Sequence, residues 1–99
     1  MRFLNNNVTK WLHNKMNFGG VRMNNIDMYN NVFIEVLDIN KDDLPNLKYQ
    51  DGDWDSVGHM SLMTALEDTF LIEMDADDII DFSSYQIGKE LMSKYNIEL

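Results

Sequence analysis

The chain contains no cysteine. This absence excludes disulfides, thiolate metal sites and a cysteine nucleophile. Proline occurs once in the 99 residues, and no apolar run approaches the roughly 18 residues that a membrane helix requires. The first residues also lack the continuous apolar segment of a secretory signal. We therefore expect a single cytoplasmic domain without a membrane span.

Basic residues are also scarce, with 8 lysines and arginines against 17 acids and a net charge of −9. Residues 1–26 hold four of the basic residues and no acid. Residues 27–99 hold the other four against all 17 acids, a net of −13. Such a surface repels nucleic acid and anionic lipid, and it attracts basic protein surfaces.

Composition divides the chain into two parts. Residues 1–25 are rich in asparagine and weakly basic, and we expect a flexible N-terminal extension there. The alternative is a short amphipathic helix that docks onto a partner or a membrane surface, since some apolar side chains keep rough helical spacing. These side chains are Val8, Trp11, Leu12 and Met16. Residues 26–99 form the predicted domain.

Apolar periodicity predicts four helices in this domain, and no sustained alternation of period two predicts a strand. The expected helices span residues 27–38, 56–70, 76–81 and 84–95. Asp27 and Asp75 are the expected N-caps of the first and third helices, and Ser83 with Gln86 has the spacing of a capping box. The predicted fold is all-α, a small four-helix bundle with a long first loop (residues 40–55) and a short third helix.

The second helix has two distinct faces. At about 100° per residue, one arc contains the expected core side chains, with His59 at its start. These side chains are Leu62, Met63, Leu66 and Phe70. The opposite face mixes exposed apolar groups with carboxylates, which favours a docking surface for partner proteins. Its members are Val57, Met60, Thr64, Glu67 and Asp68. Charge reversal at either acid is expected to slow partner reactions without unfolding the domain.

Asp55-Ser56-Val57 precedes Met60, Leu62, Leu66, Glu67 and Phe70, and this segment resembles the modification segment of acyl carrier proteins. The likeness extends over residues 26–95. It implies that Ser56 receives 4′-phosphopantetheine from coenzyme A, with Asp55 as the adjacent motif residue. It also implies that the arm carries acyl or aminoacyl groups as thioesters and that the protein has no catalytic activity of its own.

The resemblance further implies a set of partners: a phosphopantetheinyl transferase, an acyl- or aminoacyl-loading ligase, and acyl-transferring enzymes with basic docking surfaces. We expect the carrier itself to be a monomer. Several residues depart from the commonest family pattern, and they favour a specialised biosynthetic pathway over the alternative of fatty-acid synthesis. The departures are Trp54, Val57, Gly58, His59 and Ser61.

Three other interpretations use the same residues. Asp51, Asp53 and Asp55 open like an EF-hand calcium loop, but Ser56 and Leu62 stand where that loop needs glycine and glutamate. We therefore predict no metal site. Ser56 and His59 have a spacing at which a hydrolytic pair is conceivable, although His59 is expected to pack at the helix start. In a non-carrier interaction bundle, Ser56 would be a plain N-cap.

Overall fold

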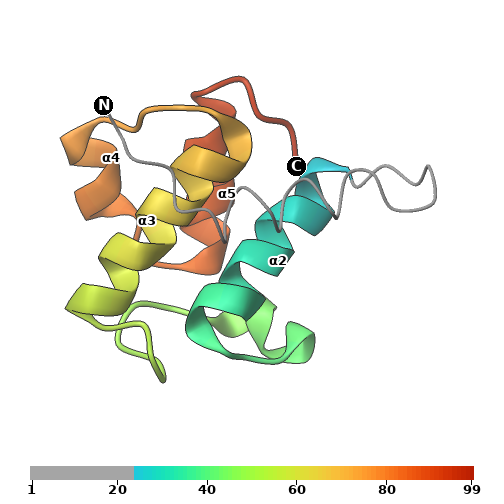
Figure 1. The fold of residues 1–99 in the computed structure, drawn as a ribbon, viewed down its shortest axis with the longest axis vertical. Coiled ribbons are helices and arrows are strands. Elements are labelled where there is room, and N and C mark those ends of the chain that lie inside the picture. Colours follow the sequence, from blue (N-terminus) through green and yellow to red (C-terminus); the bar gives the residue numbers. More distant parts are fainter. Residues whose placement is uncertain (1–23) are drawn as a thin grey trace.

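The computed structural model describes residues 24–99 and resolves them into five helices (Figure 1). These are α2 (Asn25–Leu37), the 3₁₀ helix η2 (Lys41–Asn46), α3 (Ser56–Phe70), α4 (Ala76–Asp81) and α5 (Tyr85–Ser93). No strand occurs in this part of the chain, so the all-α prediction is confirmed. None of the helices described is long and apolar enough to cross a membrane. The predicted extension, residues 1–25, lies outside the described residues except for its last two.

Two predicted helices need correction at their ends, and the first is α2. This helix starts two residues before the expected position, and its N-cap is Asn24 rather than Asp27. The Asn24 side chain accepts the backbone N–H of Asp27 at 3.0 Å. Asparagine and aspartate are about equally good caps, so an earlier asparagine competes directly with the predicted aspartate. At its other end α2 stops at Asp38, whose φ of 53° is left-handed.

The second correction is at α5. Its N-cap is Ser84, which accepts the N–H of Ile87 at 3.0 Å, so the predicted capping box of Ser83 and Gln86 is wrong. The carbonyl of Ser83 instead accepts the N–H of Tyr49 at 2.9 Å, which holds this residue in an extended connection. The side chain of Gln86 donates to the carbonyl of Pro45. The helix also ends at Ser93, two residues before the predicted end.

The long connection between α2 and α3 is folded onto the core. Its first part forms η2, in which Leu44 is buried, and Leu47 is buried just after it. The N–H of Tyr85 donates to the carbonyl of Leu47 at 3.0 Å, so the connection is tied to the start of α5. Its last part places Trp54 in the interior, fully buried.

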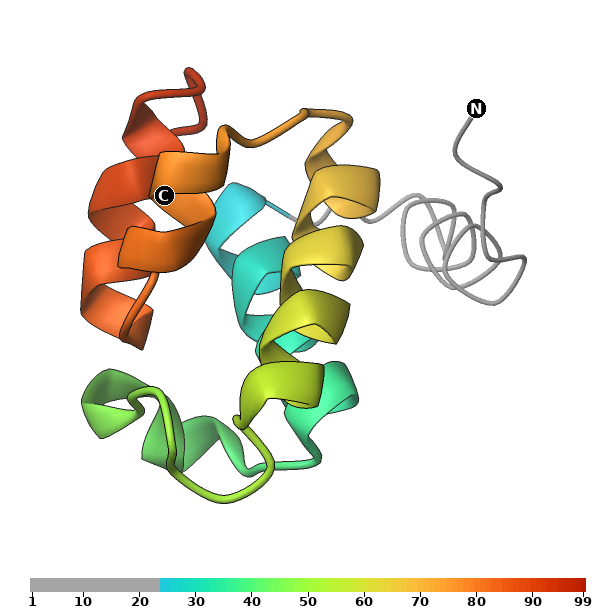
Figure 2. The ribbon, with the colours of Figure 1, turned by 90° about the vertical axis from the view of Figure 1, so that its left-hand side faces the viewer.

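The core lies between α2 and α3, which pack along one another (Figure 2). Phe33 of α2 is fully buried at its centre, with its ring 4.9 Å from that of Tyr29 and 5.5 Å from that of Trp54. Three predicted core residues of α3 are buried as expected: Leu62, Met63 and Leu66. Phe70, the fourth, is only half-buried.

A polar network joins α4 to the end of α5. The Asp78 carboxylate is buried and accepts hydrogen bonds from Lys94 Nζ at 2.7 Å and from Tyr95 Oη at 2.5 Å. Tyr95 Oη in turn accepts the backbone N–H of Asp75 at 2.9 Å. The hydrogen bond from Lys94 lowers the pKa of Asp78, and the bond from Tyr95 lowers it further.

This lowered pKa predicts an acid-dependent loss of stability. A carboxyl group with a lower pKa in the folded state stabilises the protein above its unfolded pKa of about 3.9, and the contribution is lost as the pH falls through the folded value. We expect the difference in unfolding free energy between wild type and Asp78→Asn to shrink between pH 7 and pH 2.5. Urea titrations at both pH values measure it. Asp77→Asn, an exposed neighbour, is the matched control, and an unchanged difference for Asp78→Asn would contradict the prediction.

Candidate functional site

Ser56 is the first residue of α3, and Asp55 is its N-cap. The Asp55 carboxylate accepts the N–H of Gly58 at 2.8 Å, and its carbonyl accepts the N–H of His59 at 2.7 Å. The interpretation of Ser56 as a plain N-cap is therefore wrong, because its neighbour fills that role. The hydroxyl of Ser56 is exposed at the first turn of the helix, where the backbone N–H groups of residues 56 and 57 have no acceptor within the helix.

The hydroxyl of Tyr49 lies 3.3 Å from Ser56 Oγ, within hydrogen-bonding distance. Tyr49 comes from the long connection, and its ring meets the ring of His59 edge-on, with centroids 5.5 Å apart and planes at 79°. The N–H of Tyr49 donates to the carbonyl of Ser83. The sequence analysis did not predict that Tyr49 belongs to this site. Tyr49 lies in the connection, seven residues before Ser56, and helical periodicity gives no information about contacts made by such a residue.

His59 links the start of α3 to α4. The indole N–H of Trp54 donates to His59 Nδ1 at 2.9 Å, and His59 Nε2 lies 2.7 Å from the carbonyl oxygen of Ile79. Because an indole N–H can only donate and a carbonyl can only accept, Nδ1 accepts and Nε2 carries the proton. Both ring nitrogens are occupied. The hydrolytic pairing of His59 with Ser56 is therefore wrong, whereas the expected packing role at the helix start is confirmed.

The predicted docking face is only partly exposed. Val57 is 76% exposed and Met60 53% exposed, and Thr64 is exposed as well. In α4, Ile80 is 76% exposed. These side chains place apolar surface on the two helices that His59 connects.

The acids of the predicted face lie elsewhere. Glu67 is half-buried, and its carboxylate accepts the N–H of Met74 at 2.8 Å. Asp68 is only 6% exposed, so its predicted outward position is wrong. Ala65 and Thr69, which share one side of the helix with Asp68, are also buried, so α3 is covered over a wider arc than the single stripe that the spacing predicts. Charge reversal at Asp68 is accordingly expected to destabilise the fold.

Two of the three carboxylates of the EF-hand-like segment, those of Asp51 and Asp55, bind backbone N–H groups. Asp51 accepts the N–H of Lys48 at 3.0 Å, and Asp55 accepts that of Gly58. Leu62, at the place of the last EF-hand ligand, is fully buried. Among residues 24–99 no group of three or more histidines or acids is placed to hold a metal ion.

No protein-family model, curated protein or solved structure matches this chain. Any function assigned to this site therefore depends on the geometry at the start of α3.

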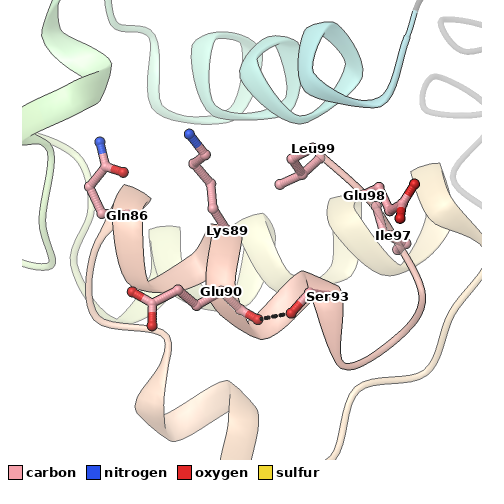
Figure 3. Close-up of a pocket in the computed structure, with 7 residues that line it drawn as sticks. All are labelled: Gln86, Lys89, Glu90, Ser93, Ile97, Glu98 and Leu99. Carbon is pink, nitrogen blue, oxygen red and sulfur yellow. Dashed lines mark hydrogen bonds between the residues drawn. The ribbon is translucent and has the colours of Figure 1, made fainter.

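The structure also has a hollow of about 620 Å³ between α5 and the C-terminal residues (Figure 3). Lys89 points from α5 toward α2 at its rim, and Ser93 Oγ donates to the carbonyl of Glu90 at 2.6 Å. Ile97 and Leu99 contribute apolar surface. None of the predicted site residues lines this hollow.

Proposed function

We propose that this protein is an acyl carrier and that Ser56 is the attachment residue of its 4′-phosphopantetheine arm. One observation carries the proposal: Asp55 caps α3, so Ser56 is not the cap and lies exposed in the first turn, where the backbone N–H groups have no acceptor within the helix. A helix N-terminus favours a phosphate, because its N–H groups and its dipole both attract negative charge. The four α-helices, with the long first connection and the short α4, form the carrier bundle in this proposal.

The attachment step needs a partner enzyme. Ser56 Oγ forms a bond to the phosphorus that bears the pantetheine, and the bond from that phosphorus to adenosine 3′,5′-bisphosphate breaks. The hydroxyl proton leaves to a base on the transferase, since both ring nitrogens of His59 are already hydrogen-bonded. The thiol of the arm then carries the acyl or aminoacyl group as a thioester. The chain has no cysteine that would compete for this group.

The partners in this proposal are a phosphopantetheinyl transferase, a loading ligase and acyl-transferring enzymes. The exposed apolar side chains around the site are Val57, Met60 and Ile80, and they give these enzymes a small contact surface. The net charge of −9 attracts their basic surfaces and makes the encounter fast and sensitive to salt.

We place the carrier in a specialised biosynthetic pathway. Two departures from the common pattern have structural roles at the start of α3. Gly58 leaves room for the backbone carbonyl of Asp53, and His59 accepts the indole N–H of Trp54.

Mass spectrometry tests the attachment. The purified protein is incubated with coenzyme A, Mg²⁺ and a broad-specificity phosphopantetheinyl transferase. We expect the intact mass to rise by one phosphopantetheine group in wild type and in Ser61→Ala, and to stay constant in Ser56→Ala. Ser61 is the matched control, because it is an exposed serine of the same helix. Failure of wild type to gain the group, or a gain that survives Ser56→Ala, would refute the carrier function.

A further inference from the structure

We infer that Tyr49 is a positioning residue for the arm, whose hydroxyl donates a hydrogen bond to the phosphodiester on Ser56. This inference rests on the proposed function. It starts from the 3.3 Å contact between Tyr49 Oη and Ser56 Oγ. The contact joins the long connection to the first residue of α3, the point at which the arm would be attached.

Attachment of the arm fixes the direction of this hydrogen bond. In the unmodified protein either hydroxyl can donate to the other. Once Ser56 Oγ is an ester oxygen it has lost its proton and can only accept, so Tyr49 becomes the donor. The unbridged phosphate oxygens, two bonds beyond Oγ, carry the negative charge. Hydrogen bonds to charged acceptors are roughly twice as strong as those between neutral groups, so the modified state strengthens the contact.

The hydroxyl of Tyr49 is held in place before the arm arrives. The Tyr49 ring is half-buried and lies edge-on to two other rings, those of His59 at 5.5 Å and Trp54 at 6.5 Å. Its backbone N–H is bonded to Ser83 on the far side. A side chain that is already ordered loses little conformational entropy when it binds the phosphate.

Charge around the site makes a neutral donor useful. Residues 49–60 contain no lysine or arginine, Lys48 just before them is ion-paired with Asp51 at 3.5 Å, and the carboxylate of Asp55 stands next to Ser56. A phosphodiester here therefore meets a negative neighbour and no cation from the segment that holds it. The tyrosine hydroxyl and the first N–H groups of α3 are neutral donors that orient the phosphate in this setting.

Tyr49→Phe tests the inference, because it removes the hydroxyl and keeps the ring. We expect transfer of the arm to this variant to slow by about 10- to 100-fold in kcat/KM, the effect of losing one hydrogen bond to a charged acceptor. We also expect the ³¹P resonance of its holo form to shift from that of wild type. Tyr95→Phe is the matched control, because its hydroxyl binds Asp78 and not the site. Circular dichroism melting verifies that each variant folds.

A second measurement uses the wild-type protein and does not depend on any variant. The ¹³Cζ resonance of Tyr49 reports on hydrogen bonding by its hydroxyl, and we expect it to change when the arm is attached. If wild type accepts the arm but this resonance stays constant, or if folded Tyr49→Phe matches wild type in both transfer rate and ³¹P shift, the inference is overturned and the carrier function stands. If wild type accepts no arm, the carrier function itself fails.

Discussion

Replacing Trp54 with alanine is expected to lower the free energy of unfolding by about 3–5 kcal/mol. The indole is fully buried, with ring centroids 5.5 Å from Phe33 and 6.3 Å from Phe82. Its removal leaves a cavity between α2 and the connection that precedes α3, and it deprives His59 Nδ1 of its donor. Denaturant titration followed by far-ultraviolet circular dichroism measures the loss.

Trp54→Phe separates packing from hydrogen bonding in the same position. Phenylalanine keeps much of the apolar contact but leaves Nδ1 of the half-buried His59 without the indole N–H, which costs about 0.5–1.5 kcal/mol, the usual net value of a hydrogen bond. The two variants should therefore differ by the packing contribution alone. A loss below about 1 kcal/mol for Trp54→Ala, a size usual for surface substitutions, would contradict the central position of this ring.

The sequence predicts α3 and α4 better than any other part of the fold. Both helices have the predicted bounds, residues 56–70 and 76–81. In each case the start of the helical periodicity predicts the first residue, and the aspartate before it is the N-cap, with a side-chain hydrogen bond at Asp55 and none at Asp75. Asn24 and Ser84 show the opposite case. Each has a neighbour of the same capping chemistry within three residues, and local sequence cannot decide which of two good caps ends the helix.

The site itself depends on contacts that helical spacing does not contain. Tyr49 reaches Ser56 because the connection folds back over the start of α3, and His59 is anchored by a carbonyl of α4, 20 residues away. Asp68 shows that helical spacing also fails to predict which polar side chains are exposed. A helical wheel assigns one buried arc to each helix, whereas tertiary packing covers a second row of α3 and buries this acid.

Three contacts hold the start of α3 in place. Asp55 caps the helix, His59 ties it to α4, and Trp54 anchors the preceding residues in the core. Ser56 lies within this set and is exposed. In the proposed carrier, this arrangement would present Ser56 to each partner enzyme in the same geometry, because the side chain lies on a helix end that is held by several contacts.

Gly58→Ala is expected to destabilise the protein by about 1–3 kcal/mol, the range for forced overpacking. Helix propensity alone predicts the opposite, a gain of about 1 kcal/mol for alanine over glycine inside a helix. The reason for the reversal is the backbone carbonyl of Asp53. A Cβ at position 58 would overlap its oxygen, and a backbone group cannot rotate away as a flexible side chain can. The start of α3 or the preceding turn must therefore move.

Because Ser56 lies in the same turn, this movement is expected to slow arm transfer as well as to lower stability. Denaturant titration measures the first effect and mass-detected transfer the second. Ser61→Ala is the matched control, an alanine substitution at an exposed site of the same helix, and it should raise stability by a few tenths of a kcal/mol with normal transfer. A Gly58→Ala variant that is more stable than wild type would show that propensity outweighs the close approach of Asp53.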